Sequence, residues 1–137
     1  VMAGSDIVAL DATGRPRLDG LSFAETVAAL REDGTLVMAD CGSFEDAQRA
    51  VDAGVDIVST TLAGYTGDRV KTDGPDLELL REVVAAFPDV PVICEGRVHT
   101  PEQAAAAMEA GAFAVIVGTA ITHPTSITTW FKAAVEG

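Results

Sequence analysis

Cysteine and basic residues are scarce in this sequence of 137 residues. The two cysteines, Cys41 and Cys94, have neither metal-ligand nor CxxC spacing, so we expect reduced thiols in a cytoplasmic protein. Nine basic residues stand against 21 acidic ones, and the net charge of −12 repels nucleic acid and anionic membranes. We therefore expect neither as a partner. A phosphate site would have to be local, built from backbone N–H groups and one or two cations.

Long apolar runs are also lacking, and none approaches the length of a membrane span. Hydrophobic residues still make up 48%, which indicates a globular chain. The length suits one domain over residues 1–137 but falls short of a usual (β/α)₈ barrel. Because the first residue is Val and a strand pattern follows within a few residues, we expect a chain cut inside a larger protein. A processed or artificially introduced terminus is the alternative.

Five short runs, nearly continuously apolar, are typical of parallel strands covered on both faces. They are residues 6–11, 35–40, 56–61, 90–95 and 113–118. Amphipathic helix patterns alternate with them, at residues 22–32, 43–53, 76–87, 100–110 and 127–135. Ser22 and Glu25 give a capping-box signal, and Pro101 suits the first position of a helix. This order predicts a parallel sheet with right-handed crossovers.

A weak repeat supports an arrangement of βα units. The pairs Ala3-Gly4, Ala53-Gly54 and Ala110-Gly111 each stand just before a strand, as expected where a helix ends on a left-handed glycine. A doubly wound sheet and a barrel both agree with this repeat.

Polar groups at the ends of all five strands favour the barrel. They are Asp11, Asp40, Thr60-Thr61, Glu95-Gly96-Arg97 and Gly118-Thr119. In a barrel all of these ends face one mouth, whereas an open sheet would favour only its switch point. The predicted fold class is α/β, a (β/α)₈ TIM barrel present here as about five βα units.

The last two strand exits have the character of a phosphate site. Gly96 and Gly118 allow backbone to approach a ligand closely, Thr119 adds a hydroxyl donor, and Arg97 can supply a cation. In phosphate-binding barrels the anion lies over the loops after the last two strands. The alternative is that Gly118 only permits a tight turn.

Glu95 is the leading catalytic candidate. It ends an apolar strand, so we expect a desolvated carboxylate able to exchange protons near neutral pH. An ion pair with Arg97 or another residue of the mouth is the alternative. Asp40 and Asp11 are similar carboxylates able to fix sugar hydroxyls, although Asp11 can equally cap its own loop around Arg15.

Residues 60–66, TTLAGYT, form an unusually polar strand exit that includes Thr60 and Tyr65. We interpret them as a substrate-facing loop in which Gly64 and Gly67 allow bending over a ligand. A tyrosine packed against a neighbouring helix is the alternative.

Five further side chains, near the strand exits or on the last helix, carry expectations. His99 and His123 each follow a strand-end motif, where a histidine can face the mouth or be solvated. Lys71 is expected to be exposed in a loop. Trp130, with its neighbour Phe131 on the last helix, is expected to seal the core.

Taken in order, the motifs resemble the N-acetylmannosamine-6-phosphate 2-epimerase family. They are residues 6–13 (DIVALDAT), 38–40 (MAD), 60–66 (TTLAGYT), 95–97 (EGR) and 118–122 (GTAIT), and the resemblance covers essentially the whole chain. It implies a ribulose-phosphate-binding type of barrel, whose fourth to eighth strands this chain would supply. The implied reaction converts N-acetylmannosamine 6-phosphate to N-acetylglucosamine 6-phosphate by proton removal and return at C2, in sialic acid catabolism.

By this resemblance, Glu95 matches the catalytic glutamate and Asp40 an aspartate that contacts the sugar. Gly118 and Thr119 match the backbone phosphate site. The implied partner is a phosphorylated amino sugar, and the resemblance implies no metal or organic cofactor.

Two departures from the family weaken the expected activity. The family's catalytic lysine lies on an earlier strand, whereas Lys71 and Lys132 fall in a loop and in the last helix, so we expect this chain alone to be inactive. His123 stands where the family usually has Arg, and it lacks a bidentate fork, so phosphate binding should be weaker or pH-sensitive.

Five βα units also leave two open sheet edges, which makes a homo-oligomer or a distorted open sheet alternatives to a larger protein. Two other functions stay open, a non-catalytic phosphosugar-binding remnant and another phosphate-binding barrel isomerase or lyase. The Tyr-containing exit and GTAIT argue against the latter.

Overall fold

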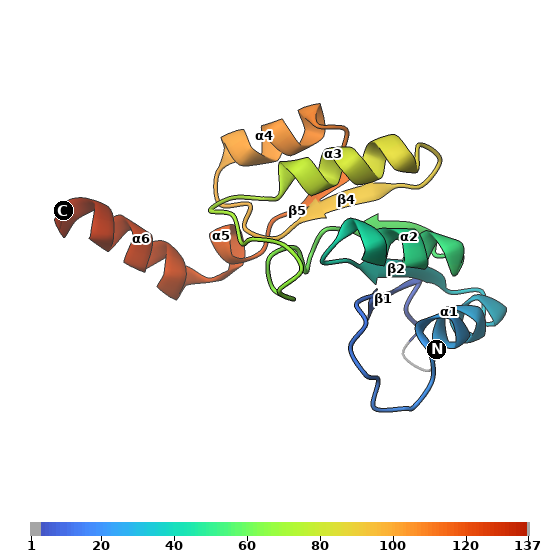
Figure 1. The fold of residues 1–137 in the computed structure, drawn as a ribbon. Coiled ribbons are helices and arrows are strands. Elements are labelled where there is room, and N and C mark those ends of the chain that lie inside the picture. Colours follow the sequence, from blue (N-terminus) through green and yellow to red (C-terminus); the bar gives the residue numbers. More distant parts are fainter. Residues whose placement is uncertain (1–3, 137) are drawn as a thin grey trace.

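The computed structural model describes residues 4–136, and Figure 1 shows strands alternating with helices along the chain. The strands are β1 (Ile7–Asp11), β2 (Leu36–Asp40), β3 (Ile57–Ser59), β4 (Val92–Glu95) and β5 (Ala114–Ile116). The helices are α1 (Phe23–Glu32), α2 (Phe44–Asp52), α3 (Leu77–Ala86), α4 (Pro101–Glu109), α5 (Thr119–Thr122) and α6 (Pro124–Glu136). Each predicted element is confirmed with shifted ends. Among these helices, none is long and apolar enough to cross a membrane.

The five strands form one parallel sheet in the order β1-β2-β3-β4-β5. Each strand pairs with the next strand along the chain, so every crossover turns in the same direction and the first four helices follow one another along one side of the sheet (Figure 1). This regular order is that of a (β/α) barrel. The carboxyl ends of all five strands therefore lie along the same edge of the sheet.

The core lies between the sheet and helices α1–α4. Val37 and Ala39 of β2 are fully buried on the helix side, where they belong to one cluster with Leu79 and Leu80 of α3. The other face of the sheet is uncovered, and Leu36 there is 46% exposed. The expectation that both faces are covered is therefore wrong for the described residues. In a barrel the second face packs against strands from across the ring, and five strands do not close that ring.

The last helix does not seal the core, contrary to the sequence prediction. Helix α6 extends away from the rest of the molecule (Figure 1), and Phe131 is 71% exposed. Trp130 touches the body through His99, with ring centroids 4.9 Å apart. The apolar pattern of α6 predicted a packed face, but no element of the described chain covers it.

Local signals place the other helices as expected. Ser22 and Glu25 form the predicted capping box, and Pro101 opens α4. Gly54 and Gly111 follow their helices with φ of +85° and +99°, as the repeat predicted. Gly4 has φ of +69°, whereas its repeat partner Ala3 lies outside the described residues.

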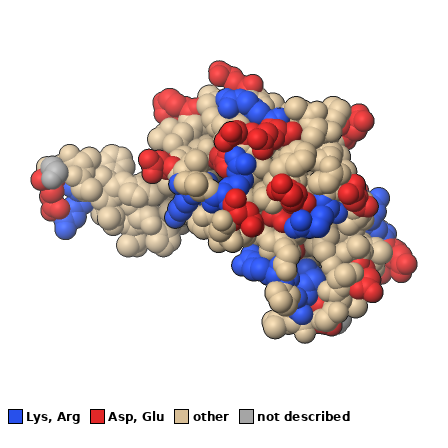
Figure 2. All heavy atoms as spheres, viewed as in Figure 1, with Lys and Arg blue, Asp and Glu red and all other residues tan. Residues whose placement is uncertain are grey.

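Acidic side chains are scattered over the visible face of the molecule, with Lys and Arg among them (Figure 2). Acidic side chains of this face are therefore at the surface, with basic side chains between them.

Candidate active site

Strand register brings two carboxylates to the same end of the sheet. Asp40 ends β2 opposite Ser59 of β3, and Ser59 pairs in turn with Ile93 of β4, two residues before Glu95. Side chains two apart on a strand share a face, so Ser59 and Thr61 point to the same side as Asp40 and Glu95. The structure thus joins the catalytic candidate Glu95 to Asp40 across β3.

Hydroxyl groups fill the space between these carboxylates. Thr61 Oγ1 lies 3.0 Å from Asp40 Oδ1 and 2.8 Å from Glu95 Oε2. Ser59 Oγ lies 3.2 Å from the same Glu95 oxygen and 2.6 Å from Thr61 Oγ1. The sequence interpretation did not include Ser59, and it included Thr61 only as part of the polar 60–66 exit. The period-two alternation of a strand, counted back from the polar exit, was the signal that could have found them.

Thr60 lies on the opposite side of the chain from these two hydroxyls. Its side chain donates to the backbone oxygen of Glu95 at 3.1 Å and accepts from the backbone N–H of Glu95 at 3.2 Å. Thr60 is 1% exposed. The side chain that was expected to bind substrate therefore fastens β3 to β4, and it holds the backbone of Glu95 in place.

Burial raises the pKa of Asp40, and the negative charges of Glu95 and Asp11 raise it further, against a hydrogen bond from Thr61 that lowers it. Within residues 4–136, no cation makes an ion pair with Asp40 or Glu95. The site thus holds two carboxylates close together without a counter-ion.

A cavity of about 270 Å³ opens beside Glu95. Six of the predicted site residues line it: Tyr65, Glu95, Gly96, Arg97, Gly118 and Thr119. The rest of the lining is Thr61, Val98, His99 and Ile116. Four predicted residues, Asp40, Thr60, Gly64 and His123, are not part of this lining. The expected phosphate end and the expected catalytic end therefore share one hollow.

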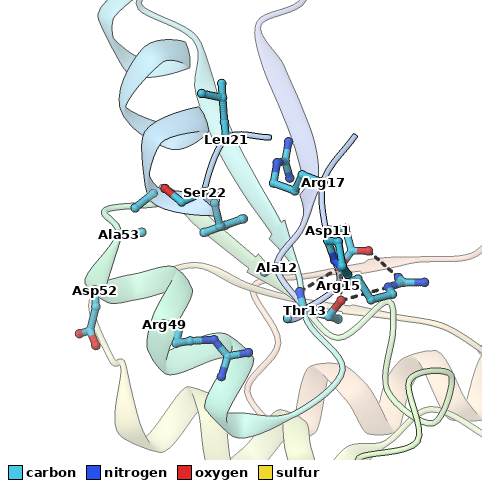
Figure 3. Close-up of a pocket in the computed structure, with 14 residues that line it drawn as sticks. Asp11, Ala12, Thr13, Arg15, Arg17, Leu21, Ser22, Arg49, Asp52 and Ala53 are labelled. Atoms are coloured by element: carbon cyan, nitrogen blue, oxygen red, sulfur yellow. Dashed lines mark hydrogen bonds and ion pairs between the residues drawn. The ribbon is translucent and has the colours of Figure 1, made fainter. Parts of the chain in front are cut away.

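A larger cavity, of about 560 Å³, lies away from Glu95, beside the loop that follows β1 (Figure 3). There Arg15 pairs with Asp11 at 2.5 Å, and Asp11 also accepts the backbone N–H and the hydroxyl of Thr13. Burial alone raises the pKa of Asp11, but the contacts with Thr13 and Arg15 outweigh it and lower that pKa. Asp11 therefore caps its own loop, one of its two predicted roles.

Arg97 is committed to the loop over residues 62–75. Its guanidinium donates to Ala63 O at 2.7 Å, Gly74 O at 3.0 Å and Thr72 Oγ1 at 3.0 Å. Arg97 is also the one non-glycine among the described residues with positive φ, at +57°. Each of the three guanidinium nitrogens of Arg97 thus donates to an acceptor in this loop, and none of these acceptors is Glu95.

Gly64 serves the packing of the same loop. It has φ of +76°, and a Cβ there would lie 2.7 Å from the Cα of Lys71. Only glycine tolerates both conditions. Lys71 in turn places its Nζ 5.0 Å from the centre of the Tyr65 ring, which lines the cavity. The bend expected at Gly64 therefore closes the loop on itself and fixes one wall of the cavity.

The expected phosphate end is open beside Gly118. Gly118 precedes α5, and a Cβ built on it would meet nothing within 4 Å. His123 follows α5, and its Nδ1 accepts the backbone N–H of Ser126 at 3.3 Å, which caps the first turn of α6. That cap explains why α6 begins at Pro124 rather than at the predicted Ile127. The His123 ring therefore caps α6 and is not part of the cavity lining.

The cysteines take no part in the cavity. Both are free and buried, and burial raises the pKa of the Cys41 and Cys94 thiols. Within residues 4–136, no group of three or more His, Cys, Asp or Glu side chains is placed to hold a metal ion. The polar groups joined beside the cavity are thus two carboxylates and the hydroxyls between them.

A parallel sheet in sequential order, with polar side chains at the carboxyl ends of its strands, defines part of a (β/α) barrel. The chain belongs to the N-acetylmannosamine-6-phosphate epimerase family, because the family described as "Putative N-acetylmannosamine-6-phosphate epimerase" matches residues 1–137.

Relatives agree with this assignment. A "Putative N-acetylmannosamine-6-phosphate 2-epimerase" of Cutibacterium acnes is 60% identical over 136 residues, which are 98% of this chain and 59% of that protein. One of the same description from Corynebacterium glutamicum is 50% identical over 131 residues, 96% of this chain and 56% of that protein. The chain therefore spans little more than half the length of these relatives.

A solved structure shows the same fold. The N-acetylmannosamine-6-phosphate 2-epimerase from Clostridium perfringens superposes with a TM-score of 0.89 at 43% identity, over 94% of this chain and 56% of that one. Both the sequence and the fold of the family are thus present in this chain.

Proposed function

We propose that this chain supplies the glutamate half of an epimerase site that inverts C2 of N-acetylmannosamine 6-phosphate. Its five strands would be the fourth to eighth of the barrel. In this proposal Glu95 exchanges the C2 proton, and the family's lysine, from an earlier strand, serves as the second group. Lys71 and Lys132 do not replace it, because the first lies in the 62–75 loop and the second on α6.

The observation that carries the proposal is the position of Glu95 in the cavity that Gly96, Gly118 and Thr119 also line. A sugar phosphate can place its anion against backbone N–H groups near Gly118 while its C2 approaches Glu95. Asp40 then contacts sugar hydroxyls from the neighbouring strand. Tyr65, fixed by its loop, forms the side wall.

Proton exchange in deuterated water tests this role. The chain would be joined to the N-terminal part of the Cutibacterium acnes relative, and N-acetylmannosamine 6-phosphate would be followed by NMR. We expect loss of the C2 proton signal and formation of the gluco epimer with the joined protein, no exchange with the chain alone, and no exchange after Glu95→Gln. A folded joined protein that leaves C2 unexchanged would refute the epimerase proposal.

A second candidate is a phosphosugar-binding protein without catalysis, and the observation that favours it is the absence of a lysine from the cavity lining described above. For that function we expect saturable binding of N-acetylmannosamine 6-phosphate by the joined protein, seen as ³¹P chemical-shift changes, without C2 exchange. Binding without exchange would select this candidate over the epimerase.

A further inference from the structure

Four short oxygen–oxygen contacts join Asp40, Ser59, Thr61 and Glu95 into one cluster. They are Thr61–Asp40 at 3.0 Å, Thr61–Glu95 at 2.8 Å, Ser59–Glu95 at 3.2 Å and Ser59–Thr61 at 2.6 Å. Three of the four involve Thr61 Oγ1. A hydroxyl oxygen can accept two hydrogen bonds but donates only one. Thr61 therefore cannot donate to Asp40 and Glu95 at the same time.

Counting protons shows that the cluster is short of donors when both carboxylates are ionised. The two hydroxyls then supply two protons for four close oxygen pairs, and two pairs are left with facing lone pairs. One additional proton on a carboxyl group leaves one such pair instead of two. If Asp40 carries it, Asp40 and Ser59 both donate to Thr61, Thr61 donates to Glu95, and the pair without a proton is the longest, Ser59–Glu95 at 3.2 Å.

We propose that Asp40 and Glu95 share one proton, which the Thr61 hydroxyl relays between them. In the transfer, the O–H bond of Asp40 breaks and its proton bonds to Thr61 Oγ1, while the proton already on Thr61 passes to Glu95 Oε2. Asp40 becomes the carboxylate and Glu95 the neutral acid. The pair carries one negative charge before and after, and no other reactant is needed.

The surroundings of the pair favour a retained proton. The adjacent carboxylate on β1, Asp11, adds negative charge, and its own cation Arg15 is held at that strand end. The guanidinium of Arg97, which lines the same cavity, donates instead to Ala63, Gly74 and Thr72. Burial of Asp40 and the charges around it raise its pKa, which agrees with the geometry.

For the proposed epimerase, on which this consequence rests, the relay lets Glu95 regain or release a proton through its neighbours in the site. Asp40 acts as the reservoir, and Thr61 is a positioning residue that acts through the two carboxyl groups. Such a path removes the need for bulk water to reach Glu95 between the two halves of the inversion.

Carboxyl ¹³C NMR of the labelled chain tests the relay without any need for epimerase activity. In the native chain we expect the side-chain carboxyl signals of Asp40 and Glu95 to move together in the same pH steps, because one proton is distributed over both. In Thr61→Val, each signal should move in its own step. Thr61→Ser should restore the common steps, and Ser59→Ala should keep them.

Two results would overturn the proposal. One is separate titration of Asp40 and Glu95 in the native chain, and the other is common titration that persists in Thr61→Val. The amide spectrum of each variant reports folding, and if Thr61→Val fails to fold, the native and Thr61→Ser titrations still decide between common and separate steps.

Kinetics of the joined protein give a second readout. We expect Thr61→Val to lower kcat about a hundredfold with little change in KM, and Thr61→Ser to stay within about threefold of native. Common titration in a joined protein that does not exchange C2 would leave the relay standing and refute the epimerase. Separate titration of Asp40 and Glu95 in a joined protein that exchanges C2 normally would refute the relay and support the epimerase.

Discussion

The guanidinium carbon of Arg97 lies 5.1 Å from the centre of the Tyr65 ring, and the same guanidinium bonds the loop on which Tyr65 stands. Arg97 directly follows the Glu95-Gly96 strand exit. One side chain thus ties the catalytic candidate's strand to the wall of the cavity. The sequence interpretation of Arg97 as the phosphate cation and this loop contact make different predictions.

Arg97→Lys should loosen the loop, because lysine keeps the charge but cannot reach Ala63, Gly74 and Thr72 together. The loss of one or two hydrogen bonds of about 1 kcal/mol each should speed trypsin cleavage after Arg69 or Lys71 about tenfold. Arg81→Lys, on the exposed side of α3, is the matched control. If phosphate were the partner instead, Arg97→Lys would weaken phosphate binding and leave the cleavage rate unchanged.

Asp76→Asn should destabilise the fold by about 3 kcal/mol, since it leaves Arg69 without its buried partner. Asp76 accepts Arg69 Nε at 2.8 Å and the backbone N–H of Leu79 at 2.9 Å, and it is 5% exposed. Urea unfolding measures the loss. Asp73→Asn, an exposed change in the same loop, should stay within about 0.5 kcal/mol of native.

The same carboxylate gives a pH dependence of known sign. Burial alone raises the pKa of Asp76, but the hydrogen bonds from Arg69 and Leu79 and the charge of Arg69 lower it overall. Its stabilising effect is therefore complete above the ordinary aspartate pKa and is lost as the pH falls through the lowered value. Unfolding measured from about pH 5 down to about pH 2 should show this loss in the native chain and not in Asp76→Asn.

Asp40→Asn should have the opposite effect, because the folded state raises the pKa of Asp40. The contribution of Asp40 to stability is complete below the ordinary aspartate pKa and declines as the pH rises through the raised value. At neutral pH the amide should therefore stabilise the fold and remove that part of the pH dependence. Urea unfolding at neutral and acid pH measures both effects. Asp89→Asn on the surface is the control, and a neutral-pH destabilisation by Asp40→Asn would contradict the prediction.

The order and type of the elements were predictable because their signals are local. The capping box at Ser22 and Glu25 and the glycine after each Ala need only neighbouring residues. Thr60 and Thr61 face opposite sides of the sheet because side chains alternate along β3. The polar exit was recognised from the sequence, but which of its two hydroxyls faces the same side as Asp40 and Glu95 follows only once one residue of β3 is placed.

Long-range partners account for the other differences. Arg97 bonds carbonyl groups of Ala63 and Gly74, in a loop that has no periodic pattern, and these acceptors cannot be identified from residue types. For α6, the apolar residues Trp130 and Phe131 predicted a packed face. Whether such a face is covered depends on which elements surround it, and that information lies outside the helix itself.

The uncovered face of the sheet gives the last prediction. Leu36 and Ile7 are 46% and 47% exposed there, next to each other in the β1–β2 register, and Ile116 lies on β5. A contiguous apolar face of this kind binds the dye ANS and promotes association. Leu36→Thr should lower ANS fluorescence of the chain by roughly a third. Leu18→Thr, at a fully exposed loop leucine outside the sheet, should leave it unchanged.

Completion of the barrel is the stronger form of the same test. Joined to the N-terminal part of the Cutibacterium acnes relative, the sheet gains strands that can cover this face, because barrel strands fill their common interior with side chains. ANS fluorescence should then fall to the level of an ordinary folded protein, and sedimentation should show less association at high concentration. Fluorescence that stays high in a folded joined protein would show that this face is not the interior of a barrel, and the assignment of β1 to β5 as the fourth to eighth strands would fail with it.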